Sequence, residues 1–169
     1  MIMKTILYMT LTATGQFVQA DEAHPIPQEI LADFGRLVGK TGNLIVGRRT
    51  YDLMHAQLAG GGFSGIEVVV VSHAPLQAEG VSVAGTPREA VRHLEQKGFE
   101  SALVGGGALL DGAFLSQGPV DEIYLNVEPR LASRGGILAA EGLLSTTLRL
   151  MGTAHLTDDI VQLHYGADR

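Results

Sequence analysis

Residues 102–129 read ALVGGGALLDGAFLSQGPVDEIYLNVEP and carry the strongest structural signal in the chain. An apolar run leads into three consecutive glycines, a short helical segment follows, and a second apolar run closes the stretch. A strand that turns through Gly105, Gly106 and Gly107 directly into a helix exposes bare backbone and free N–H groups at the helix start, where a phosphate group can bind. The stretch therefore predicts a nucleotide-binding site.

Length and composition limit the classes of protein. The 169 residues suit a single domain over residues 1–169 with one core. Only 18% of the residues are charged, against about 25% in soluble globular proteins, so we expect a homodimer. The formal net charge of −6 argues against nucleic acid or an anionic membrane as partner. The absence of cysteine excludes disulfides, thiolate metal sites and thiol nucleophiles.

The N-terminal residues imitate a secretory signal only loosely, because their apolar part is short and interrupted by threonines. The run from Ile6 to Met9 fits better as a buried first strand that leads into a turn at Gly15. No apolar run approaches the roughly 18 residues of a membrane span. We therefore expect a cytoplasmic protein.

Strand and helix signals alternate along the chain. Apolar residues recur at helical spacing from Pro27 to Val38, where Gly39 can end the helix, and Thr86–Glu89 forms a capping box for a helix that stops at Gly98. Residues 148–156 and 160–165 flank a turn as a hairpin. Buried strands are expected at residues 43–46, 67–72 and 122–127. The pattern predicts an α/β fold, mostly parallel with a C-terminal antiparallel hairpin.

Three weaker motifs receive structural interpretations. Gly39-Lys40-Thr41 lacks the glycine spacing of a phosphate-binding loop and is interpreted as a helix C-cap. Ser64 lacks the second glycine of a nucleophile elbow. The six histidines show no tight ligand spacing, so we predict no metal site.

The glycine triplet is also compatible with a doubly wound dinucleotide fold or with a purely structural turn. Gly105 and Gly107 fit the first half of the dinucleotide fingerprint G-x-G-x-x-G, and Glu128 follows about twenty residues later, where an acid would hold a ribose. However, Leu110 occupies the third glycine position. Both alternatives therefore stay open.

A second strand-to-helix junction favours the nucleotide interpretation. It places Arg48, Arg49 and Thr50 on the first turn of a helix, where positive charges oppose the helix dipole unless an anion binds. Two solvated surface arginines are the alternative. A third strand ends in Ser72 and His73. Three strand ends with phosphate-compatible groups suggest one extended dinucleotide across the edge of a sheet.

Four segments together resemble the dihydrofolate reductase superfamily, and more closely the reductase domain of the bifunctional riboflavin-biosynthesis deaminase–reductase. They are Gly47-Arg48-Arg49-Thr50-Tyr51, the Val-Val-Ser ending at Ser72, Val104-Gly105-Gly106-Gly107 and Val120-Asp121-Glu122-Ile123. The similarity covers nearly the whole chain. It implies a dihydrofolate-reductase-like mixed sheet with helices on both faces, an NADPH cofactor, and hydride transfer to an imine-like or open-chain sugar carbon of a heterocyclic substrate.

The resemblance also implies which residues bind the cofactor. Residues 48–50 would meet its phosphates, Ser72 and His73 its adenosine end with the 2′-phosphate, and residues 105–109 its pyrophosphate, while Met9 and Thr10 would face the nicotinamide. The family commonly has a cis peptide bond between adjacent glycines, expected here at Gly105-Gly106 or Gly106-Gly107. The implied set is Met9, Thr10, Gly47, Arg48, Arg49, Thr50, Ser72, His73, Gly105, Gly106, Gly107, Ala108 and Leu109.

The substrate side follows from the same resemblance, with departures. The implied residues are Thr12, Thr14, Gly15, Asn126, Glu128, Arg130 and Arg134, of which the two arginines could hold a substrate phosphate. A polar strand end in water stays open for Asn126 and Glu128. Thr14 stands where the riboflavin enzymes carry an acid. Folate reductases place an acid early on the first long helix, where it protonates or orients the pterin, and Glu29 or Asp33 could occupy that region, but both are interpreted as helix-surface acids. No catalytic residue is therefore assigned.

The sequence thus predicts an NADPH-dependent reductase of a small heterocycle, such as a ribosylamino-pyrimidine phosphate. A dihydrofolate reductase and a non-catalytic dinucleotide-binding protein are the alternatives.

Overall fold

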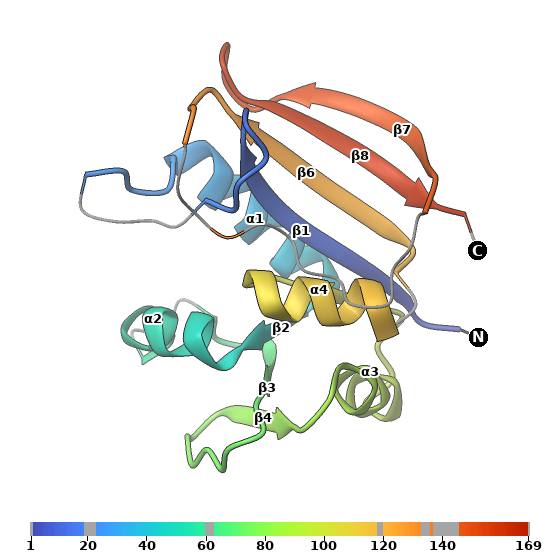
Figure 1. The fold of residues 1–169 in the computed structure, drawn as a ribbon. Helices are drawn as coiled ribbons and strands as arrows, with labels where there is room; N and C mark the ends of the chain where they lie inside the picture. Colours follow the sequence, from blue (N-terminus) through green and yellow to red (C-terminus); the bar gives the residue numbers. More distant parts are fainter. Residues whose placement is uncertain are drawn as a thin grey trace.

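The computed structural model describes residues 2–18, 23–59, 63–117, 120–132, 136 and 146–168. Within these ranges, eight strands form one sheet in the order β4-β3-β2-β5-β1-β6-β8-β7 (Figure 1). The elements are β1 Lys4–Thr12, α1 Gln28–Thr41, β2 Asn43–Gly47, α2 Arg48–Ala59, β3 Glu67–Val71, β4 Val81–Ala84, α3 Pro87–Gln96, β5 Ser101–Val104, α4 Ala108–Gln117, β6 Glu122–Glu128, β7 Leu148–His155 and β8 Val161–Ala167.

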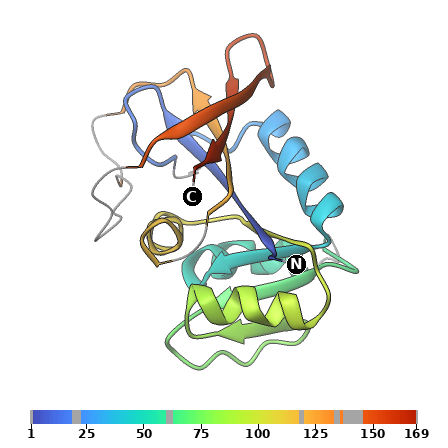
Figure 2. The same cartoon turned by 90° about the vertical axis from the view of Figure 1, so that its right-hand side faces the viewer.

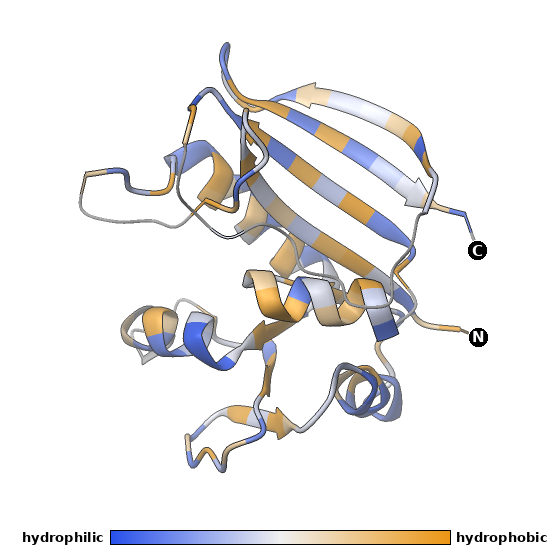
Figure 3. Ribbon diagram, viewed as in Figure 1, coloured by the Kyte–Doolittle hydropathy of each residue, from blue (hydrophilic) through white to orange (hydrophobic). Residues whose placement is uncertain are grey.

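The sheet has a parallel and an antiparallel part. Strands β4, β3, β2, β5, β1 and β6 run parallel, whereas β8 is antiparallel to both β6 and β7. Polar and apolar residues alternate along β6 and β8, as expected for strands with two different faces (Figure 3). The predicted α/β sheet with a C-terminal hairpin is confirmed. Because β1 lies between β5 and β6, the doubly wound alternative is wrong.

Helices cover both faces of the sheet. The apolar cluster on one face includes Ile30 and Leu37 of α1 and Tyr51 of α2. The cluster on the other face includes Leu94 of α3 and Phe114 of α4. Figure 2 shows α1 and α4 on opposite sides of β1. None of the helices in the described ranges is long and apolar enough to cross a membrane.

The helix ends test the local predictions. The predicted cap at Thr86 is confirmed, because the Glu89 N–H donates to Thr86 Oγ1 at 3.2 Å, although the Glu89 carboxylate accepts from the Gly85 N–H at 2.7 Å and not from the Thr86 N–H of a complete capping box. The prediction that Gly39 ends α1 is wrong, since the helix continues to Thr41 and Gly42 forms the cap. Gly42 has a φ of 71° and donates its N–H to the Val38 carbonyl, so it supplies the left-handed residue that helix termination favours.

Strand β4 was not expected from the sequence. It spans four residues at the edge of the sheet and pairs with β3 from Val68 to Val71. A strand of this length carries too few alternating positions to stand out from a loop.

Candidate functional site

The carboxyl ends of five adjacent parallel strands form one edge of the sheet. Their order is β3, β2, β5, β1 and β6, and strands lie about 4.8 Å apart, so the edge extends roughly 19 Å from β3 to β6. The predicted cofactor residues lie in or directly after the last residues of the first four strands. The predicted substrate residues that the structure describes lie in or after the last residues of β1 and β6. The structure therefore places the two sets side by side, with β1 at their boundary.

The glycine loop after β5 has little room for a side chain at its first position. A Cβ on Gly105 would lie 2.8 Å from Leu44 Cδ1 and 2.9 Å from Phe34 Cζ. Gly106 has a φ of 93°, and the peptide bond between Gly106 and Gly107 is cis, at one of the two predicted places. The Gly47 N–H donates to the Gly106 carbonyl at 2.9 Å. The end of β2 and the loop after β5 are thereby joined through their backbones.

Helix α4 begins directly after this loop. The Asp111 N–H donates to the Gly107 carbonyl at 3.0 Å, so the N–H groups of residues 108–110 precede the first helical hydrogen bond and remain available to a ligand. Leu109 is exposed, whereas Ala108 is partly buried. Free N–H groups and the positive end of the helix dipole favour a bound anion here.

Asp111 lies beneath this helix start, and sequence reasoning missed it. Its side chain is buried, both of its carboxyl oxygens lack a hydrogen-bond partner among the described residues, and a Cβ on Gly106 would be 3.6 Å from Oδ2. Burial raises the pKa of Asp111 well above its ordinary value. A neutral carboxyl group adds no negative charge to a site that would bind phosphate.

The first turn of α2 faces the same loop. Thr50 Oγ1 lies 3.4 Å from the Cβ position of Gly107, and Arg49 is exposed. Arg48 Nε donates to Asp52 Oδ1 at 3.0 Å, four residues along the helix. Asp52 therefore offsets part of the charge that the sequence suggested an external anion must balance, and this weakens that argument.

The end of β3 is followed by Ser72 and His73. Ser72 Oγ donates to the Ala74 carbonyl at 2.9 Å and accepts the Ala74 N–H at 3.2 Å, so its hydroxyl is used within a turn. His73 is exposed. Both residues directly follow β3, which is the outermost of the five strands named above and lies next to β2.

The two residues expected at the nicotinamide point to opposite faces of β1. Met9 is buried in the apolar cluster beneath α3 and α4, so only its backbone reaches the edge. Thr10 is partly buried on the α1 side, where its Oγ1 accepts a hydrogen bond from Asn126 Nδ2 at 3.2 Å. Thr10 and Asn126 also face each other in the β1–β6 register.

A polar network continues from Asn126 into the fold. Gln162 Nε2 on β8 donates to Asn126 Oδ1 at 2.9 Å and to Asp33 Oδ2 at 2.7 Å. Asp33 Oδ2 also accepts the Tyr8 hydroxyl at 3.0 Å. Asn126 has 0% exposed surface and Glu128 has 8%, so neither is a polar strand end in water.

Asp33 is not the helix-surface acid that the sequence indicated. Its side chain is 11% exposed and Arg36 donates to Oδ1 at 2.9 Å, whereas Glu29 is exposed. Burial would raise the pKa of Asp33, but hydrogen bonds from Gln162, Arg36 and Tyr8 outweigh it and lower the pKa below its ordinary value. Asp33 is therefore a carboxylate at neutral pH.

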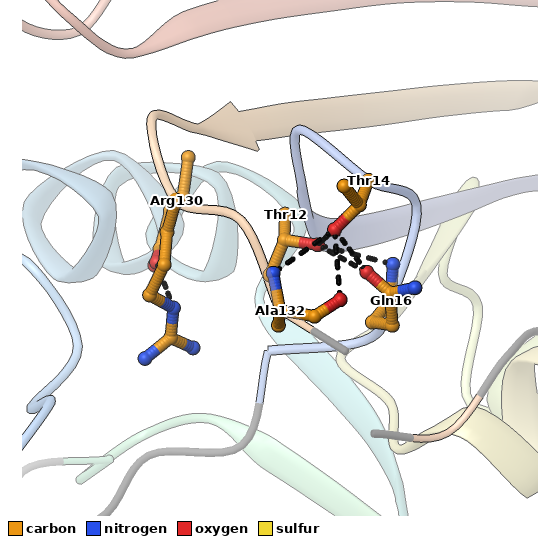
Figure 4. A network of polar contacts seen from close by, with 6 residues as sticks. Thr12, Thr14, Gln16, Arg130 and Ala132 are labelled. Carbon is orange, nitrogen blue, oxygen red and sulfur yellow. Dashed lines mark hydrogen bonds and ion pairs between the residues drawn. The ribbon is translucent and has the colours of Figure 1, made fainter. Parts of the chain in front are cut away.

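Glu128 and Arg130 form the far end of the site. Arg130 Nε lies 3.9 Å from Glu128 Oε2, while Glu128 Oε1 is buried without a hydrogen-bond partner among the described residues. Burial raises the pKa of Glu128, against the opposing charges of Arg130 and His24. Figure 4 shows Arg130 beside the loop that follows β1.

Thr12, Thr14 and Gln16 form a hydrogen-bonded group in that loop (Figure 4). Thr12 Oγ1 donates to Gln16 Oε1 at 2.8 Å. Thr14 Oγ1 lies 3.0 Å from the carbonyl and 3.1 Å from the N–H of Ala132. The residue at the position of the family's acid thus links the loops after β1 and β6. Gly15 has a φ of 86° in the same turn, and the predicted Arg134 lies outside the described residues.

Sequence reasoning missed Tyr8 and Gln162 in addition to Asp111. For Gln162, the available signal was its place as a polar residue between Val161 and Leu163, which could have indicated a buried polar contact. Metal binding was not expected, and among the described residues no group of three or more His, Asp or Glu side chains could hold a metal ion.

Comparisons with known proteins identify the fold and the family. The chain is similar to a Shewanella sp. PV-4 protein assigned to riboflavin biosynthesis, with a TM-score of 0.81, 21% identity and coverage of 99% of this chain and 100% of that one. It is similar to the Thermotoga maritima diaminohydroxyphosphoribosylaminopyrimidine deaminase/5-amino-6-(5-phosphoribosylamino)uracil reductase, with a TM-score of 0.75, 13% identity and coverage of 98% of this chain but 57% of that one.

A third similar structure is Enterococcus faecalis dihydrofolate reductase in complex with NADP(H) and RAB-propyl, with a TM-score of 0.71, 17% identity and coverage of 98% and 97% of the two chains. A comparison with curated protein sequences finds no match. The sequence profile of the RibD C-terminal domain matches residues 9–162. The chain therefore belongs to the RibD C-terminal domain family and has the dihydrofolate-reductase-like fold.

Proposed function

We propose that this protein is an NADPH-dependent reductase that transfers a hydride to a small heterocycle of the ribosylamino-pyrimidine phosphate type. The observation that carries the proposal is the continuity of the sheet edge. Along this edge, backbone groups suited to phosphate lie at the ends of β2 and β5. Thr10 on the next strand, β1, then contacts the buried side chain of Asn126 on β6. A cofactor and a reducible ring can therefore lie against each other above β1.

The cofactor side is supported by the start of α4. Its free N–H groups and the glycine loop would hold the pyrophosphate, with Thr50 opposite Gly107. Exposed Arg49 is free to meet a further phosphate, whereas Arg48 is paired with Asp52. Bound NADPH would supply the hydride, and the protein would supply binding and orientation.

The substrate side is supported by Asn126, Glu128 and Arg130. The guanidinium of Arg130, with Arg134 as a second candidate, would bind a substrate phosphate. Reduction of an imine also requires a proton, and Glu128 is a buried carboxyl group whose pKa is raised. We therefore propose Glu128 as the proton donor, a role that the sequence left unassigned.

The relatives support this choice over the alternatives. One similar structure is described as a riboflavin biosynthesis protein, and another is named as a deaminase and uracil reductase. The dihydrofolate reductase complex contains NADP(H) in the same fold. In this chain, both carboxyl oxygens of Asp33 already accept hydrogen bonds from the protein, which disfavours a direct salt link to a pterin.

Calorimetric titration with NADPH and NADH, followed by measurement of NADPH oxidation, tests the proposal. We expect NADPH-selective binding and turnover of 5-amino-6-(5-phosphoribosylamino)uracil, with dihydrofolate as the control substrate. Turnover of dihydrofolate alone would favour the folate reductase. Binding of NADPH without turnover of either compound would favour a non-catalytic dinucleotide-binding protein, and no binding of either cofactor would refute both proposals.

A further inference from the structure

We propose that Asp33 is a positioning residue that, through Gln162 and Asn126, turns the hydroxyl proton of Thr10 outward as a hydrogen-bond donor. The donor would serve a carbonyl oxygen on one of the reacting rings, either the nicotinamide carboxamide or the substrate. This inference rests on the proposed function, since it assumes that these rings meet above β1.

The direction of the network begins at the carboxylate. Asp33 can only accept hydrogen bonds, so the group of Gln162 that faces it at 2.7 Å must be the amide nitrogen. The same nitrogen lies 2.9 Å from Asn126 Oδ1. Its two protons are therefore shared between Asp33 and Asn126, and the orientation of the Gln162 amide is fixed.

The orientation of Asn126 follows from that of Gln162. Because the oxygen of Asn126 accepts from Gln162, its nitrogen must face Thr10 Oγ1, at 3.2 Å. The hydroxyl oxygen of Thr10 is consequently an acceptor in this bond, and its single proton is left for another partner. The structure records no acceptor for that proton among the residues it describes.

Thr10 lies near the edge of the sheet at which the ligands are proposed to bind. In the register of the sheet, Leu7 of β1 pairs with Val104, the last residue of β5. Thr10 therefore lies three residues, or about 10 Å, further along β1 than the point where β5 ends and the glycine loop begins. Thr10 is partly exposed, whereas Asn126 is fully buried.

A purely structural network is the alternative, and variants separate the two. Thr10→Val removes the donor and keeps the branched shape, whereas Thr10→Ser keeps the hydroxyl. Asp33→Ala removes the anchor, whereas Asp33→Asn retains an oxygen that can accept from Gln162. Asn126→Asp replaces the nitrogen that faces Thr10 with an oxygen, so the Thr10 proton would turn inward.

Titrations with NADPH and with 2′-phospho-ADP-ribose, which lacks the nicotinamide, supply the test. If the acceptor is the carboxamide, Thr10→Val, Asp33→Ala and Asn126→Asp weaken NADPH binding about 3- to 10-fold and leave 2′-phospho-ADP-ribose unchanged. If the acceptor is the substrate, NADPH affinity is unchanged and the KM for the uracil compound rises by a similar factor. Thr10→Ser and Asp33→Asn should stay within about twofold of the unaltered protein.

Thr5→Val is the matched control. Thr5 is a β1 threonine on the opposite face, its Oγ1 is buried without a partner among the described residues, and its loss should change neither measurement. The double variant Thr10→Val with Asn126→Asp should bind no more weakly than either single variant, because both remove the same donor. Circular dichroism confirms that each variant is folded.

Each contrary result has a distinct meaning. Unchanged values for Thr10→Val in both titrations and in KM would overturn the donor, and equal damage from Thr10→Ser would show that Thr10 only packs. A harmful Thr10→Val beside a harmless Asp33→Ala would overturn the positioning role of Asp33. If the unaltered protein binds no NADPH, the proposed function fails and the donor's role fails with it.

Discussion

Two regions of the sheet edge formed by the carboxyl ends of the parallel strands are built from different kinds of chemical group. The proposed cofactor end, at β2 and β5, is shaped by backbone: a glycine, Gly105, where a Cβ would lie closer than 3 Å to two side chains, a backbone bond between Gly47 and Gly106, and N–H groups at the start of α4. The substrate end, at β1 and β6, is shaped by side chains that hold one another by hydrogen bonds. Substitutions that add atoms should therefore damage the first end, and substitutions that remove or alter polar groups should damage the second.

Gly105→Ala should have the largest effect. The new Cβ would meet Leu44 and Phe34 closer than 3 Å, and Leu44 is fully buried, so we expect a loss of about 3 kcal/mol in the free energy of unfolding, with weaker NADPH binding. Urea denaturation measures the loss. Gly35→Ala in α1 is the control, because its Cβ would meet nothing within 4 Å and alanine favours helix by about 1 kcal/mol. Equal losses in the free energy of unfolding for Gly105→Ala and Gly35→Ala would contradict the proposed sensitivity of this end to added atoms.

Asn126→Leu should cost somewhat less and act only at the substrate end. It leaves the Gln162 amide and the Thr10 hydroxyl without their partner, which we expect to lower the free energy of unfolding by about 2 kcal/mol. The affinity for 2′-phospho-ADP-ribose should not change. A loss of that affinity would show that the two ends are coupled.

Asp33 and Asp111, one at each end, should make the free energy of unfolding depend on pH in opposite directions. Asp33 has a lowered pKa when folded, so its contribution is present above the unfolded value of about 4 and is lost as pH falls through the folded pKa. Asp111 has a raised pKa, so the folded protein holds more protons than the unfolded chain, and stability falls as pH rises from about 4 toward the folded pKa.

Denaturation at a series of pH values checks both signs. Asp33→Asn should flatten the acid side of the profile, and Asp111→Asn should flatten the decline at higher pH. A profile that either variant leaves unchanged would contradict the protonation state assigned to that residue.

Thr5→Val should give the smallest change, and one of opposite sign. The hydroxyl of Thr5 is buried without a partner among the described residues, so its replacement by a methyl group of similar shape should raise the free energy of unfolding by up to about 1 kcal/mol. Thermal unfolding measures the gain. A loss would indicate that this hydroxyl is satisfied in solution.

The sequence located the glycine loop after β5 better than the polar contacts between β1, β6 and β8, and the difference has a physical cause. A glycine loop between a strand and a helix is a local pattern, so residues 105–109 could be located, and the family resemblance added the expectation of a cis bond at one of two places there. Parallel strands then bring Gly47 and Ser72 to the same edge without further information.

The substrate end depends on pairings that no local pattern reveals. Gln162 meets Asn126 only through the antiparallel register of β6 and β8, and Asp33 reaches Gln162 from a helix. Asp33 therefore looked like a surface acid. The Arg48–Asp52 pair, by contrast, has ordinary helical spacing and could have been found before the anion argument was made.

The hydrogen bonds between Thr14 and Ala132 connect the loops after β1 and β6, so the two loops should move together. The N–H of Ala13 also donates to the Arg130 carbonyl at 3.0 Å, so the segment after β1 is fastened to the segment after β6 at two points. A substrate that displaces one segment has to carry the other with it. We expect entry and release at this end to follow a single rate, common to both segments, and Thr14→Val to raise that rate by freeing them from each other.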